Sequence, residues 1–229
     1  LEQKLFVNRT EYLKDLSYVL LNLETHDEGR LLKDYTGFDI WRGATFYSIA
    51  AASRGSLMLQ VGQEWGEPWD LGFKRSDYLR GRFPTEANWD GRGDKLTALY
   101  KAIHDARSAP ENVALRKGNY WFPRMDNGKV KDQLFGMVKY MPDCTNTVFT
   151  FARLWVDDVE ATYSMTPDLA AAICLADDAR YKLVDVFTGE DVWATTNPGG
   201  RTGRHLRDFG IYVHLDLGTS FQWLRLEQY

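Results

Sequence analysis

In the first half of the chain, short continuous runs of apolar residues alternate with segments whose apolar residues recur at the spacing of a helix. The runs at 17–24 and 56–61 are nearly uninterrupted, which is typical of strands buried on both faces of a parallel sheet. Helices are predicted at 10–16, at 40–52 and from Asp94 onward. In the last of these, four apolar residues spaced i, i+3, i+4 and i+7 share one face: Leu96, Leu99, Tyr100 and Ile103. Alternation of helix and strand predicts βα units around a parallel sheet.

Past residue 117 the pattern changes to one typical of antiparallel strands. Strands are predicted in four segments, many of them alternating: 134–140, 147–155, 181–187 and 211–217. A tight turn is expected at 188–190, and one short helix with Thr166 as N-cap and Pro167 as its first residue. The sequence therefore predicts an α/β segment over 1–117 and an all-β domain with one helical insertion over 118–229.

Composition and charge argue against two classes of binding partner, nucleic acid and membrane. The net charge of −4 provides no basic surface for nucleic acid, so we expect none as a ligand. No run of about 18 apolar residues occurs, so no membrane partner is expected either. Aromatic residues reach 14%, and these side chains fill cores or stack on sugar rings. The absence of a signal peptide carries no information, because the chain begins at Leu1 rather than at a methionine.

Two cysteines, Cys144 and Cys174, do not make a disulfide framework. This usage favours a reduced, cytoplasmic setting, while a single bridge between them stays open. The four histidines are scattered without the spacing of a zinc site, and the acidic segments do not match a calcium loop. No metal ligand is therefore assigned.

Two predicted strand ends carry polar residues that can face a ligand, because reacting groups of α/β barrels lie at the carboxyl ends of strands. His26 and Asp27 follow the first strand; the histidine can hydrogen-bond a hydroxyl, and the carboxylate can stabilise an oxocarbenium-like state. The alternative is a polar loop with solvated charges. Gln63 and Glu64 follow the second strand and are interpreted mainly as bracing loop backbone. Trp65, with Trp69 and Trp89 further along this region, either packs or lines a sugar cleft.

The order of these motifs resembles that of the α-amylase superfamily. Residues 21–28 are similar to the signature at the end of barrel strand seven, and residues 55–66 to the strand-eight signature. Residues 103–107 resemble the end of the eighth barrel helix, and 181–190 a recurring stretch of the β-sandwich C domain. The sequence departs from the family at three positions, where Asn or proline is usual: Thr25, Arg54 and Leu57.

This resemblance implies the C-terminal portion of a (β/α)8 barrel over 1–117, followed by an antiparallel β-sandwich over 118–229. It implies that Asp27 stabilises the transition state and that His26 binds the sugar of an α-glucan or maltooligosaccharide substrate. Trp65, taken from the Trp-rich region after the second strand, is predicted to bind the same substrate. The nucleophilic aspartate and the acid/base glutamate of the family would precede Leu1. We therefore expect a fragment, inactive alone, whose partner is the missing N-terminal half of the barrel. No cofactor is implied, although some relatives bind calcium.

Three other functions remain open at this stage. A branching or maltosyl-transferring enzyme would differ in whether a sugar hydroxyl replaces water as the attacking group. A catalytically silent relative would bind glucan or act as a scaffold. A carbohydrate-binding β-sandwich would retain glucan affinity in residues 118–229 alone.

Overall fold

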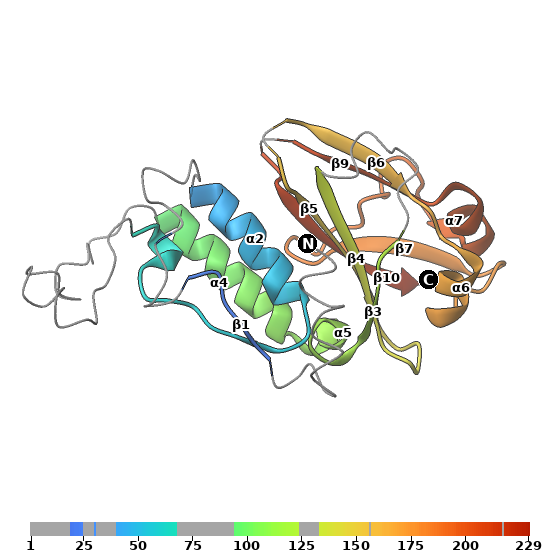
Figure 1. Ribbon diagram of the computed structural model, residues 1–229. Coiled ribbons are helices and arrows are strands. Elements are labelled where there is room, and N and C mark those ends of the chain that lie inside the picture. Colours follow the sequence, from blue (N-terminus) through green and yellow to red (C-terminus); the bar gives the residue numbers. More distant parts are fainter. Residues whose placement is uncertain are drawn as a thin grey trace, which may run out of the picture.

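The first half of the chain forms two parallel strands backed by two long helices. Strand β1 (Leu20–Leu21) pairs with β2 (Ser56–Leu57), and helices α2 (Ile40–Ala52) and α4 (Asp94–Ser108) lie side by side (Figure 1). The computed structural model describes residues 19–24, 30, 40–67, 94–123, 133–155, 157–216 and 218–229. The predicted parallel βα arrangement is confirmed, although both strands are shorter than their apolar runs. The helix expected at 10–16 lies outside the described residues.

Arg107 joins the two long helices. Its guanidinium, near the end of α4, donates to carbonyls at and beyond the end of α2: those of Ala51, Ser53 at 2.9 Å and Gly55 at 2.5 Å. The last carbonyls of a helix lack partners within the helix, so this side chain satisfies acceptors that would otherwise be buried alone. Burial and the nearby Arg116 lower the pKa of Arg107 to about 10, which leaves it a cation at neutral pH.

The second half forms two antiparallel sheets. The larger sheet has the strand order β3-β4-β5-β10-β7-β8, and β6 pairs with β9 in the smaller one. The strands are β3 (Asn119–Trp121), β4 (Leu134–Tyr140), β5 (Thr147–Arg153), β6 (Val159–Tyr163), β7 (Arg180–Asp185), β8 (Arg201–Thr202), β9 (Ile211–Leu215) and β10 (Phe221–Gln228). Short helices α6 (Pro167–Ala172) and α7 (Gly203–Phe209) complete this half, and α5 (Val113–Lys117) comes just before it in the chain.

The expected helical insertion is present as α6, where Thr166 Oγ1 accepts a hydrogen bond from Leu169 N at 3.3 Å. The turn at 188–190 is also confirmed, with Asp185 N donating to Glu190 O at 2.8 Å. The expectation of a single helix in this domain is wrong. Helix α7 begins after Thr202, whose hydroxyl accepts from His205 N at 3.1 Å, and is too short to show an apolar period.

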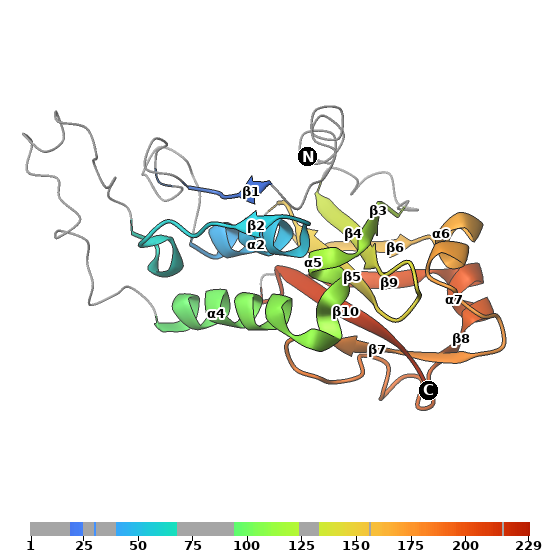
Figure 2. The same ribbon diagram turned by 90° about the horizontal axis from the view of Figure 1, so that it is seen from below.

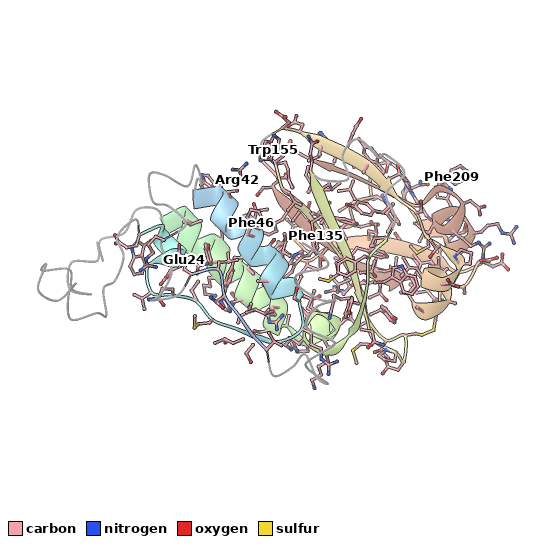
Figure 3. All side chains as sticks on the ribbon, in the orientation of Figure 1. Glu24, Arg42, Phe46, Phe135, Trp155 and Phe209 are labelled. Carbon is pink, nitrogen blue, oxygen red and sulfur yellow. A yellow bond between two sulfur atoms is a disulfide. The ribbon has the colours of Figure 1, made fainter. Side chains whose placement is uncertain are left out.

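The six-stranded sheet is covered on both faces. One face packs against β6, β9, α6 and α7 around Phe149, Phe151 and Leu183. The opposite face packs against α2, α4 and α5, and its buried residues are Phe135, Met137, Val148, Ala152 and Trp223. Figure 2 shows α2 and α4 beside this second face, and Figure 3 shows Phe46 of α2 near Phe135 of β4. Although the expected boundary at 117/118 stays a prediction, the packing is continuous across it.

A disulfide joins Cys144, in the turn between β4 and β5, to Cys174, just after α6. Their Cα atoms lie 5.8 Å apart, a separation typical of such bridges. The sequence left open whether these two cysteines are reduced or form a disulfide, and in the structure they form the disulfide. A bridge of this kind persists in oxidising compartments, so the thiol state of protein isolated from its source would test the cytoplasmic prediction.

Replacing both cysteines with serine is expected to lower the free energy of unfolding by about 2–4 kcal/mol, because the bridge restricts the unfolded chain. Both residues also keep a positive φ, 64° and 53°, which serine would have to adopt without the covalent link. Urea unfolding of the double variant should match that of wild-type protein in reductant. Equal stability of the oxidised wild type and the variant would contradict this expectation.

Lys139 lies fully buried in β4, with its Nζ donating to Gly118 O at 2.8 Å. Burial, with the positive charges of Arg54 and Arg107, lowers the pKa of Lys139 to about 7. Between this value and the lysine pKa of about 10.4 in the unfolded chain, unfolding takes up a proton, so stability must rise with pH.

Lys139→Met is expected to remove this pH dependence. From pH 7.5 to 9.5 the free energy of unfolding of the wild type should rise by roughly 2 kcal/mol relative to the variant, because one differential proton contributes ~1.4 kcal/mol per pH unit. Urea titrations at both pH values measure this. The matched control, Lys101→Met, removes an exposed lysine of α4 and should keep the wild-type slope. Equal slopes for wild type and Lys139→Met would refute the assignment.

Candidate functional site

The carboxyl ends of β1 and β2 lie at one edge of their small sheet. The ladder is parallel: Ser56 N donates to Val19 O and Met58 N to Leu21 O, both at 2.8 Å. The residues that follow each strand therefore emerge at the same edge, where an α/β architecture places its reactive groups.

A buried ion pair links the residues on either side of the segment 25–29. Arg30 Nη1 donates to Glu24 Oε2 at 2.6 Å. The side chains of Arg30 and Glu24 are only 2% and 3% exposed, respectively. The second amino group of Arg30 donates to Val61 O, beyond β2, at 2.5 Å. One guanidinium thus connects the segment after β1 to the segment after β2. Figure 3 shows Glu24 beside α2 and α4, away from the two antiparallel sheets.

The turn after β2 depends on Gly62. Its φ of 96° lies in a region that side chains disfavour, and a Cβ there would fall 2.6 Å from Glu67 Cβ and 3.3 Å from Arg30 Nη2. Glu64 Oε2 accepts a hydrogen bond from Gly62 N at 3.1 Å, inside the 3-10 turn η3 (Gln63–Trp65). Glu64 therefore braces loop backbone, as the sequence indicated, whereas the same expectation for Gln63 is wrong, because its side-chain amide donates to the Tyr100 hydroxyl.

Behind this turn runs a buried polar network. Gln63 Nε2 donates to Tyr100 Oη at 3.3 Å, the Tyr100 and Tyr47 rings lie 4.8 Å apart, and Tyr47 Oη lies 2.7 Å from His104 Nε2. Burial raises the pKa of Tyr47 to about 12 and also raises that of Tyr100, while burial and Arg107 lower the pKa of His104. All three side chains are therefore neutral at pH 7. Among the residues that the structure describes, buried Gln63 Oε1 has no hydrogen-bond partner.

The structure describes only part of the predicted site. Trp65 lies in η3, half-buried, with its indole Nε1 3.4 Å from Glu67 Oε2, and its role as a sugar platform stays a prediction. His26 and Asp27 lie outside the described residues, as do Trp69 and Trp89. Sequence reasoning missed Glu24 and Arg30. The available signal was a pair of opposite charges bracketing the polar segment after an apolar run.

Two other kinds of site are absent from the described part of the chain. Within the residues of this part, no three or more His, Cys, Asp or Glu side chains come together as metal ligands. Among the same residues, no helix combines the length and apolar character needed to span a bilayer.

Neither a protein-family model nor a curated protein sequence matches this chain. Solved structures do. The α-amylase of Geobacillus thermoleovorans, complexed with acarbose, aligns with 96% of this chain and 42% of its own, at 16% identity and a TM-score of 0.65. An Anoxybacillus α-amylase aligns with 99% of this chain and 42% of its own, at 13% identity and a TM-score of 0.66. AmyP in complex with maltose aligns with 90% of this chain and 40% of its own, at 18% identity and a TM-score of 0.58.

The chain has the fold of the C-terminal part of an α-amylase. It spans about two fifths of the length of these α-amylases. In fold, β1, β2, α2 and α4 correspond to the last part of a (β/α)8 barrel, and the two antiparallel sheets correspond to a β-sandwich. Leu20 of β1 is 52% exposed, so one side of the described barrel segment presents an apolar residue to solvent.

Proposed function

We propose that this chain is the C-terminal part of an α-glucan-active glycoside hydrolase or transglycosylase of the retaining, α-amylase-like kind. In this proposal Asp27 stabilises the oxocarbenium-like transition state, and His26 and Trp65 bind the sugar. The observation that supports the proposal is the combination of an α-amylase-like fold with a His-Asp pair, His26 and Asp27, in the segment that follows strand β1 in the sequence.

The buried Glu24–Arg30 pair supports the assignment of this strand end. Burying an ion pair costs desolvation free energy, which is offset only by good geometry and further hydrogen bonds. Arg30 meets both conditions through Glu24 and Val61 O. Such a contact fixes the residues that flank 25–29 relative to the turn after β2, and placement of reacting groups is a large part of catalysis.

The fold also supports the proposal that catalysis needs more than this chain. A retaining mechanism requires two carboxyl groups about 5–5.5 Å apart, one nucleophile and one acid/base. Neither is assigned among these residues, so we propose that both come from the remainder of the barrel, within a longer protein or from a partner chain. Saccharides are bound by the structural relatives, one of which is solved with maltose and another with acarbose.

The test is to express the longer protein that contains this chain and to incubate it with maltooligosaccharides. Products are followed by chromatography, and their anomeric configuration by NMR. Release of α-anomers supports a retaining enzyme, and the ratio of shorter to longer products separates hydrolysis from transfer. A protein that leaves every α-glucan and activated α-glucoside unchanged would overturn the proposal and favour a silent glucan-binding or scaffold protein.

A further inference from the structure

The Cys144–Cys174 disulfide can be reached from solvent. Cys174 is exposed and Cys144 is half-buried. Both residues line an open cavity of about 730 Å³ beside the end of β10, and a cavity of this size admits a small organic molecule. A disulfide exchanges only where a thiolate can reach one of its sulfur atoms. The bridge therefore meets the first condition for reversible reduction in the folded protein.

Each cysteine occupies a backbone position that favours glycine. Cys174 follows α6 with a φ of 53°, and its N–H donates to Ala171 O at 3.1 Å, while Leu175 N donates to Ala170 O at 2.8 Å. This is the Schellman pattern that ends helices, in which the left-handed residue is usually glycine. Cys144, in the turn after β4, has a φ of 64°. After reduction no covalent link would keep either residue in this disfavoured conformation.

The turn that the bridge fixes also holds the start of α5. Asn146, two residues after Cys144, is buried. Its side chain accepts a hydrogen bond from Ala114 N at 2.9 Å and donates one to Glu111 O at 2.7 Å. Ala114 lies in the first turn of its helix, where an N–H group has no acceptor within the helix. The turn between β4 and β5 supplies that acceptor.

From the start of α5 the hydrogen bonds continue into the two long helices. Asn112 Nδ2 donates to Ala106 O of α4 at 2.9 Å, and Arg116 donates to the carbonyl of Arg107. Arg107 in turn donates to Ser53 O, beyond the end of α2, at 2.9 Å. The bridged turn is thus the point at which the six-stranded sheet is hydrogen-bonded to α5, and α5 is the first element that its release would affect.

We propose that the Cys144–Cys174 bridge is a redox-sensitive latch, which holds the turn after β4 on α5 when oxidised and frees it when a small dithiol reduces it. A thiolate of the dithiol attacks Sγ of the more exposed Cys174, and Cys144 leaves as a thiolate. The second thiol of the dithiol then attacks this mixed disulfide, releases Cys174 and closes its own disulfide. The dithiol thereby supplies two electrons and two protons, and both cysteines end as thiols.

The test is native-state hydrogen exchange of the 229-residue chain, measured by NMR with and without dithiothreitol. A bridge that only restricts the unfolded chain leaves local opening of the native state unchanged. For a latch, we expect the Ala114 amide to exchange at least about tenfold faster after reduction, because the turn that carries its acceptor opens more often. Mass spectrometry after thiol alkylation measures reduction, and circular dichroism shows whether the reduced chain is folded.

An amide elsewhere and two variants provide the controls. Gly189 N, which donates to Asp185 O at 2.8 Å in another tight turn, should keep its exchange rate. Cys144→Ser/Cys174→Ser should exchange at Ala114 as fast as the reduced wild type, whether or not dithiothreitol is present. Asn146→Ala keeps the bridge but removes the acceptor, so its Ala114 amide should exchange fast in both redox states.

Three outcomes would overturn the latch. The first is a bridge that dithiothreitol does not reduce while the chain is folded, or whose reduction unfolds the whole chain. The second is an Ala114 exchange rate that reduction does not change. The third is equal acceleration at Ala114 and Gly189, because that result indicates a general loss of stability. None of these outcomes affects the proposed function, which is judged by product formation in the longer protein.

Discussion

Asp27→Asn in the longer protein is expected to lower kcat/KM on maltooligosaccharides by about three orders of magnitude or more. A carboxylate fixed near the anomeric carbon acts mainly on the transition state, where positive charge develops, so its loss should lower kcat with little change in substrate binding. Steady-state kinetics and calorimetry with maltotriose measure the two quantities separately.

Glu28→Gln is the matched control for this experiment, because it removes one negative charge from the neighbouring residue. We expect its kcat/KM to stay within a few-fold of wild type. If Asp27→Asn were as active as wild type, the assignment of Asp27 would fail even in a protein that cleaves α-glucans. Comparable losses in both variants would instead indicate a general effect of charge in this segment.

Arg30→Met is expected to lower the free energy of unfolding of the chain by about 3–5 kcal/mol. The substitution takes away the cation that contacts the buried Glu24 carboxylate, and breaking one side of a buried ion pair is far more costly than replacing both. It also removes the donor to Val61 O. The double variant Glu24→Leu/Arg30→Met, which removes both charges, should therefore recover a large part of the loss. Urea unfolding monitored by tryptophan fluorescence measures all three proteins.

An exposed ion pair with a similar N···O distance provides the control. Lys101 Nζ lies 2.5 Å from Asp105 Oδ2, but the two side chains are 74% and 64% exposed. Exposed pairs contribute little because water and salt screen them, so Lys101→Met should leave stability unchanged within error. A loss no larger in Arg30→Met than in Lys101→Met would show that the Glu24–Arg30 contact does not stabilise the fold.

Elements with a local signal could be predicted from the sequence. Helix α2, helix α4 and the N-cap of α6 each depend on residues within a few positions of one another, and so do the alternating strands β4 and β5. Strand β10 was missed because Arg225 and Glu227 interrupt its apolar pattern. Those charges are tolerated inside the sheet because they contact one another and Lys182, which belongs to a strand far away in sequence.

The candidate site was only partly accessible to the same reasoning. The positions of His26, Asp27 and Trp65 after predicted strands could be inferred, since the motif and the strand end are both local. The Arg30 contact to Val61 could not, because it joins residues 31 positions apart whose proximity follows from the parallel pairing of β1 with β2. Lys139 shows the same limit: nothing local indicates that a lysine within a strand is fully buried.

The helices that cover one face of the six-stranded sheet have a consequence for how this protein can be divided. Phe135, Met137 and Trp223 belong to the six-stranded sheet, and they share one buried cluster with residues of α2, α4 and α5. A truncation at residue 117 would remove these helices and expose an apolar face of the sheet to solvent. An exposed apolar face of this kind favours self-association. A truncated form that keeps this face of the sheet covered therefore has to begin no later than the start of α2.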